Sequence, residues 1–196
     1  MKKILGIMLC IISIFSFVSC IYYERSIDTD ISNYDEKILE VGYAVEFMPA
    51  IDSLEDYTSV SYSHQCVPDF IGCFESIVLF VQYDACIYKA QKAKICSKYS
   101  FLTETKLSSD KEEYELILPS FEYKTYSISI VDKGLGWENP SLQSFGMVGF
   151  DDERSIVAYC YFYNVDLDYI AKTDEDLNVI TQAFMDTYFY WNDIED

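Results

Sequence analysis

Residues 74–83, FESIVLFVQY, and residues 155–163, SIVAYCYFY, decide the fold. The first stretch contains the unbroken apolar run Ile77–Val81, which is typical of a strand at the centre of a sheet. The second stretch predicts another strand. A short charged segment joins it to residues 144–150, so we expect these two strands to form a hairpin. Working outward, further strands are expected at residues 58–65, 114–118 and 121–131.

Two helices are predicted beside these strands. Asp84 is suited to cap a helix, and small and apolar residues recur at helical spacing over residues 86–97. Residues 173–176 have the pattern of a capping box. One stripe of apolar side chains follows it, namely Leu177, Ile180, Phe184, Tyr188 and Trp191. We therefore predict an α+β fold, mainly an antiparallel sheet of about five or six strands, with one internal and one C-terminal helix packed on it.

The start of the chain has a different character. Two lysines precede the apolar run Ile4–Val18, which ends at Ser19 and Cys20. A short basic segment, an apolar stretch and a small residue are typical of an export signal. The ending Phe17-Val18-Ser19-Cys20 resembles the lipobox of bacterial lipoproteins, with Phe17 in the position that is usually Leu.

The lipobox resemblance implies cleavage before Cys20 and attachment of lipid, such as palmitate, to Cys20. On this interpretation residues 1–19 are a signal peptide, residues 20–37 are the lipidated cysteine and a tether, and residues 38–196 are a single α+β domain. Several acyl chains would hold the protein firmly, because a single chain binds a membrane only marginally.

An uncleaved anchor is the alternative for this segment. Ile4–Tyr23 has about the 20 apolar residues that span a bilayer. In both cases Lys2 and Lys3 keep the N-terminus in the cytoplasm. We therefore expect a cell-membrane protein whose domain lies on the extracytoplasmic side.

The part of the chain after the signal is strongly acidic. The signal holds two of the 14 basic residues and none of the 33 acidic ones, which leaves 12 against 33 and a formal charge of −21. Nucleic acid is an unsuitable partner, because phosphate binding requires clustered Lys and Arg. Anionic lipid would also repel such a domain. The expected partners are the membrane, through lipid on Cys20, and another envelope protein.

The sequence offers few residues for catalysis or metal binding. His64 is the one histidine of the chain, and Cys66 shares its face of the predicted strand, but a nucleophile and its base usually meet across a fold. Zinc sites would need more histidine or a C-x-x-C pair. The acidic residues at 164–176 lack the glycine turn and terminal Glu of an EF-hand. We predict no catalytic residue, no metal and no cofactor.

Five cysteines follow Cys20, and an odd number leaves at least one thiol free. Cys66 and Cys73 flank a short connection that contains proline, where they could pair across a hairpin. Cys86 and Cys96 are separated by about 15 Å along one predicted helix, which exceeds the ~7 Å limit for a disulfide. Most of the cysteines are expected to be buried and reduced. The pairing of Cys66, Cys73, Cys86, Cys96 and Cys160 stays open.

Tyrosine supplies the candidate binding residues, since the chain contains 18 of them. Tyr159, Tyr161 and Tyr163 share one face of a predicted strand, opposite its apolar face. If that face is uncovered, these rings form an aromatic strip suited to a protein interface. The alternative is that they form a second layer of the core.

These features favour a lipid-anchored cell-envelope protein that acts as a non-catalytic binding or interaction module. One alternative is an envelope enzyme that uses paired carboxylates, for instance on a glycan. Another is a receptor for a small ligand. Two carboxyls converging in a cleft, one with a raised pKa, would favour the enzyme.

Overall fold

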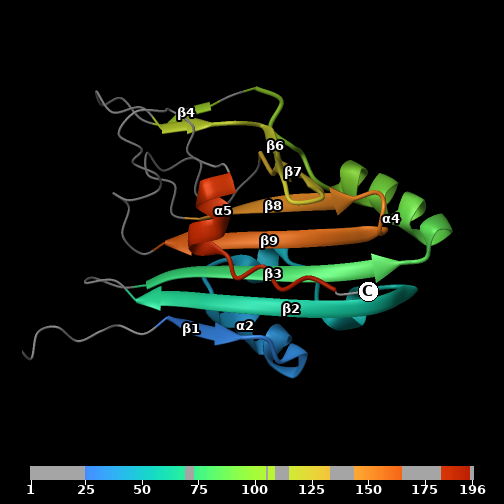
Figure 1. Cartoon of the computed structure of the whole chain (residues 1–196), viewed down its shortest axis with the longest axis horizontal. Coiled ribbons are helices and arrows are strands. Elements are labelled where there is room, and N and C mark those ends of the chain that lie inside the picture. The colour runs from blue at the N-terminus through green and yellow to red at the C-terminus, as the bar shows by residue number, and fades with distance from the viewer. Residues whose placement is uncertain are drawn as a thin grey trace, which may run out of the picture.

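The computed structural model describes residues 25–68, 73–104, 106–108, 115–132, 144–164 and 182–194. Seven antiparallel strands form one sheet in the order β1-β2-β3-β9-β8-β7-β6, with helices on both of its faces (Figure 1). The predicted α+β class and mainly antiparallel sheet are confirmed. The expected strand count was too low, and short helices near the N-terminus were missed.

The strands of the sheet are β1 (Ser26–Asp28), β2 (Tyr57–Pro68), β3 (Cys73–Tyr83), β6 (Ser120–Tyr123), β7 (Tyr126–Ile130), β8 (Ser144–Asp151) and β9 (Ile156–Asn164). A separate ribbon consists of β4 (Lys106–Ser108) and β5 (Glu115–Ile117). The helices are α2 (Tyr34–Glu40), α3 (Ala44–Phe47), α4 (Ala85–Lys98) and α5 (Gln182–Tyr188), with 3-10 turns η1 (Ile31–Asn33) and η2 (Ile51–Ser53).

The two stretches that decide the fold lie side by side. Strand β3 is between β2 and β9, and β9 forms the expected hairpin with β8. The run Ile77–Val81 is fully buried because successive side chains enter different cores. Val78 and Phe80 belong to one hydrophobic cluster, whereas Ile77 and Leu79 belong to the cluster on the opposite face.

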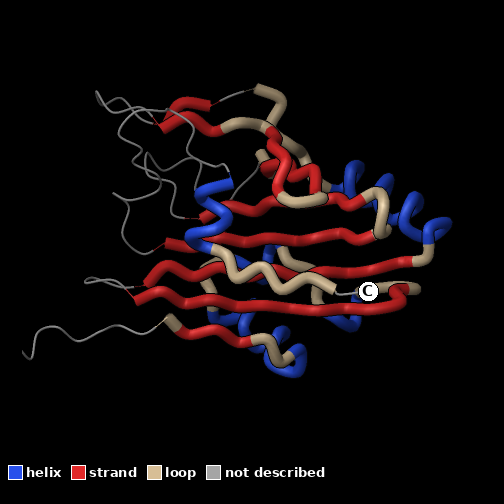
Figure 2. The backbone as a smooth tube through the Cα atoms, in the orientation of Figure 1, coloured by secondary structure: helices blue, strands red, loops and turns tan. Residues whose placement is uncertain are grey.

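Each face of the sheet has its own cover (Figure 2). Helices α2 and α3 pack on one face, and α4 adds two buried side chains to the same cluster. Helix α5 and the extended tail after it cover the other face, where Phe184, Met185 and Phe189 are buried. Trp191, expected on the C-terminal helix, packs on this face from the tail, beyond the end of α5. The predicted capping box and Leu177 and Ile180 lie outside the described residues.

The tail also explains the polar face of β2. Ser63 donates a hydrogen bond to the Tyr190 carbonyl, and the Gln65 amide donates one to the Tyr188 carbonyl at 3.0 Å. Both side chains are buried. These two buried side chains therefore donate hydrogen bonds to backbone carbonyls of α5 and the tail, as buried polar groups require.

The boundary expected at Lys37 lies too far along the chain. Strand β1 pairs with β2, opposite residues 64–66, and Tyr34 at the start of α2 is fully buried. Arg25 donates a hydrogen bond to the Thr187 carbonyl at 2.9 Å. From residue 25 the chain is therefore part of the folded domain. The edge strand β1 has only three paired residues, so the mixed polar composition of this stretch gave no recognisable strand pattern.

A second correction concerns residues 121–131, which were expected to form one strand. The structure divides them into β6 and β7, joined at Lys124 and Thr125. Lys124 has φ of 53°, a left-handed conformation that lysine rarely adopts. Because Lys-Thr is not a recognised turn sequence, the hairpin could not be seen in the residues alone.

Candidate functional site

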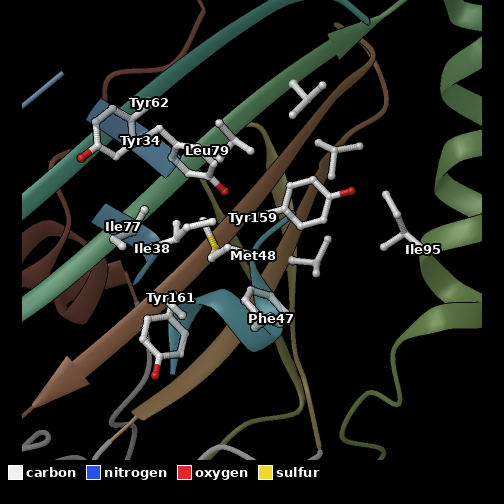
Figure 3. Close-up of a cluster of buried hydrophobic side chains, with 14 of the residues drawn as sticks. Tyr34, Ile38, Phe47, Met48, Tyr62, Ile77, Leu79, Ile95, Tyr159 and Tyr161 are labelled. Carbon is white, nitrogen blue, oxygen red and sulfur yellow. The ribbon is translucent and has the colours of Figure 1, made fainter. Parts of the chain in front are cut away.

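The tyrosines proposed for binding lie under helices. Tyr159 is 5% exposed and Tyr161 is fully buried, and both lie among the core side chains of this face (Figure 3). The Tyr161 hydroxyl accepts a hydrogen bond from the Tyr43 backbone N–H at 2.9 Å. Its ring stacks on Phe47 of α3 with centroids 6.5 Å apart. The expected exposed strip is therefore wrong for these two residues, which form a second core layer. Tyr163 is half-buried against the same cluster.

The turn between α2 and α3 packs closely against the rings of Tyr161 and Tyr163. Gly42 has φ of +49°, and a Cβ added there would lie 2.6 Å from Cδ2 of Tyr163. Glycine is required for both reasons, the left-handed backbone and the close approach. This contact positions the following residues, Tyr43 and Val45, on the outer side of the turn.

Three large apolar side chains are exposed around this turn. Leu39 is 68% exposed, Tyr43 60% and Val45 47%. Asp35, Glu36, Glu40 and Glu46 are exposed in the same segment. We call Leu39, Tyr43 and Val45, with these four acidic residues, the α2–α3 surface. An apolar centre with a charged border is typical of surfaces that bind proteins. Composition did not reveal it, because this stretch was partly assigned to the tether.

A second group of chemically active side chains lies at the paired ends of β2 and β3. His64 Nε2 donates a hydrogen bond to Oε2 of Glu75 at 2.8 Å, and the Cys73 thiol donates one to Oε1 of the same carboxylate at 3.3 Å. Cys66 lies opposite Glu75 in the sheet register. We call these four residues the hairpin-end cluster. The sequence had placed His64 and Cys66 on one face, which the structure confirms, but it could not show that Glu75 lies opposite Cys66 and bonds to His64.

The electrostatics of this cluster keep the Cys73 thiol protonated. Burial, followed by the hydrogen bond to Glu75 and the charge of that carboxylate, raises the pKa of Cys73 to about 12. Burial opposes ionisation of Glu75, but the hydrogen bonds from His64 and Cys73 outweigh it and hold the pKa of Glu75 below its usual value. Because the thiolate is the nucleophile of cysteine enzymes, this arrangement does not activate Cys73. The imidazole contacts the carboxylate rather than a thiol, so it is not placed as the base of a Cys-His pair.

Another carboxylate is buried at the opposite end of the sheet. Asp151 is 1% exposed and accepts hydrogen bonds from the backbone N–H groups of Glu153 and Arg154 and from Nε of Arg154. Arg154 also reaches Asp193 at 2.7 Å. Burial alone would raise the pKa of Asp151, but the bonds from Thr125 and Arg154 lower it. Asp151 and Glu75 thus both have lowered pKa values, whereas a catalytic acid needs a raised one.

No group of three or more His, Cys, Asp or Glu side chains in the described part of the chain is arranged to hold a metal ion. All five cysteines after Cys20 have free thiols. Cys160 is buried as expected, but Cys66 and Cys73 are half-buried and Cys86 and Cys96 are exposed on α4, so the expectation that most of them are buried is wrong. The acidic residues from 165 to 176, like Cys20 itself, lie outside the described residues.

None of the helices formed by the described residues is long and apolar enough to cross a bilayer. No protein-family model, curated protein or solved structure matches the chain. The site must therefore be interpreted from its own geometry.

Proposed function

We propose that the protein is a lipid-anchored component of the cell envelope whose domain binds another envelope protein and performs no catalysis. The observation that carries this proposal is the α2–α3 surface, where Leu39, Tyr43 and Val45 are 47–68% exposed. The lipobox-like ending at Cys20 supports the anchor. The lowered pKa values of Glu75 and Asp151 favour binding over acid–base chemistry.

The distance from the anchor limits where the partner lies. Strand β1 begins at Ser26, and the six residues from Cys20 to Ser26 reach about 20 Å at most. Ser26 pairs with Cys66, and β2 and β9 end on the side of the sheet where β1 begins (Figure 1). Tyr43 bonds to Tyr161 near that end of β9. The α2–α3 surface therefore lies near the anchored side of the domain, within reach of a protein at the membrane surface.

Charge indicates the chemistry of the partner. Glu36, Glu40 and Glu46 are exposed in the same segment as the apolar side chains, and Glu40 is paired with Lys37 at 2.6 Å. Such a surface suits a partner with an apolar contact patch bordered by Lys or Arg. It is repelled by anionic lipid headgroups. We therefore assign the surface to a protein rather than to the bilayer.

Photocrosslinking in living cells tests this proposal. A photoreactive amino acid is placed at Leu39, and a matched control carries it at Tyr57, which is also exposed but lies at the start of β2. We expect a crosslink to one protein from position 39 and no crosslinked protein from position 57. With the partner purified, Tyr43→Ser should weaken binding about tenfold, and binding should weaken further as salt rises.

Two results would contradict the interaction surface. One is the same set of products from both positions, which indicates random collision. The other is binding of the captured protein that is indifferent to Tyr43→Ser and to salt. Membrane retention of the wild-type protein, measured in parallel, separates failure of the surface from failure of the anchor.

A further inference from the structure

Two thiols of the hairpin-end cluster are diagonal neighbours across the β2–β3 pair. Cys66 and Glu75 are directly opposite in the register of β2 and β3, and Cys73 lies two residues from Glu75 on the same face. The Cys66 thiol is among the groups that raise the pKa of Cys73, after burial and Glu75. Both cysteines are half-buried, so small reagents have access to them while Cys160 is shielded.

We propose that Cys66 and Cys73 form a redox-active pair that closes to an intramolecular disulfide by exchange with a disulfide oxidant. This proposal concerns a covalent modification of the hairpin end and does not depend on the α2–α3 surface. An extracytoplasmic location would favour the closed form, because disulfides persist in oxidising compartments. The exchange itself can be tested on the purified protein.

The position of the pair at the strand ends makes closure feasible. Diagonal neighbours in a sheet have Cα atoms about 7–8 Å apart, slightly beyond the ~7 Å limit for a disulfide. Cys73 is paired with Pro68 in the last rung of the ladder. Proline has no N–H to donate, so this rung is weaker and Cys73 can move toward Cys66.

The Cys66–Cys73 disulfide forms in two steps of thiol–disulfide exchange. The Cys66 thiolate attacks one sulfur of the oxidant, RSSR, which forms a Cys66–SR mixed disulfide and releases RS⁻, and RS⁻ takes up a proton. Cys73 then loses its proton and attacks the Cys66 sulfur, which releases the second RS⁻. Overall, two protein thiols are oxidised to one disulfide, and RSSR is reduced to two RSH.

Glu75 controls the rate of the second step. Burial first, and then the hydrogen bond to Glu75 and the charge of that carboxylate, raise the pKa of Cys73 to about 12, so the Cys73 thiolate is scarce at neutral pH. The thiolate fraction rises tenfold with each pH unit below the pKa, and closure should accelerate accordingly. Glu75→Gln removes the negative charge with little change in shape, so it should accelerate closure severalfold at a given pH.

Peptide mapping of the full-length protein in detergent is the test. The protein carries Cys86→Ser and Cys96→Ser, which remove the two exposed thiols of α4, and is incubated with oxidised glutathione or with reductant. Free thiols are then alkylated under denaturing conditions, and the digest is examined by mass spectrometry. We expect a Cys66–Cys73 linked peptide, two alkylated thiols fewer than in the reduced sample, and faster linkage at pH 9 than at pH 7.

The proposal is overturned if glutathione remains on Cys66 while Cys73 stays alkylatable after prolonged incubation. A linked peptide that pairs Cys160 with either residue would overturn it as well. The wild-type linkage is informative even if Glu75→Gln does not fold. Cys66→Ser, the matched control, should leave Cys73 fully alkylatable.

Discussion

Asp151 illustrates how a charged residue of this acidic chain becomes structural. It ends β8 and begins the short charged segment from which the sequence predicted a hairpin. Its carboxylate binds the turn's own N–H groups and the guanidinium of Arg154, and Arg154 in turn binds Asp193 of the C-terminal tail. Asp151 therefore connects the hairpin to the tail.

Asp151→Asn should lower the free energy of unfolding by about 3 kcal/mol at pH 7, because it leaves Arg154 without its buried partner. The pKa of Asp151 is lowered in the folded state, so its stabilisation is complete above the unfolded pKa of about 3.9 and is lost as the pH falls below that value. The difference in the free energy of unfolding between wild type and Asp151→Asn should therefore be smaller at pH 3 than at pH 7. Urea unfolding at both pH values measures this.

Asp152→Asn is the matched control from the same turn. Asp152 is 69% exposed and pairs with Lys92 on α4, and an exposed pair contributes at most about 1 kcal/mol. Equal losses of unfolding free energy in Asp151→Asn and Asp152→Asn would contradict the assigned role of Asp151. So would a loss in Asp151→Asn that is the same at pH 3 and pH 7.

The alternation of residues along a strand predicted which side chains share a face of the sheet. It did not predict which other elements pack on that face. Alternation correctly separated Tyr159 and Tyr161 from Ala158 and Cys160, which lie in opposite cores. It could not show that both faces are covered. The cover comes from α2 and α3, more than a hundred residues earlier in the chain, and no local pattern carries that information.

Strand and helix positions were predicted well where the apolar signal is long. Strands β2, β3, β8 and β9 and helix α4 lie within a few residues of their expected ranges. Short elements with mixed composition, such as β1 and α3, gave too weak a signal. Asp84 is the N-cap residue of α4 as expected, but its side chain makes no capping hydrogen bond to the helix.

The β6–β7 hairpin permits a test of the missed turn. Lys124 adopts φ of 53°, which costs a non-glycine residue about 1–2 kcal/mol. Lys124→Gly should therefore stabilise the domain by about 1 kcal/mol and raise the Tm by about 2–4 °C. Thermal unfolding followed by circular dichroism measures this.

Lys89→Gly provides the contrast, because Lys89 is exposed within helix α4. Glycine there should cost about 1 kcal/mol of stability. If Lys124→Gly also destabilises the domain, the positive φ in this turn is not a source of strain.

The described part of the molecule combines two cores on one sheet, and its three most exposed large apolar side chains, Leu39, Tyr43 and Val45, lie around the turn between α2 and α3. The N-terminus of the sheet lies at the edge strand β1, so a lipid on Cys20 would hold the domain within about 20 Å of the bilayer. The acidic domain and the anionic membrane surface repel each other. With the proposed anchor in place, we expect the domain to contact a partner protein rather than the bilayer.

The intact mass of the protein from isolated membranes shows whether Cys20 carries lipid. We predict a wild-type chain that begins at Cys20 and carries acyl chains, and a Cys20→Ala variant that keeps residues 1–19 and carries no lipid. A wild-type chain that begins at Met1 with an unmodified Cys20, together with equal membrane retention of Cys20→Ala, would contradict the lipid anchor. Ile4–Tyr23 would then be an uncleaved membrane anchor.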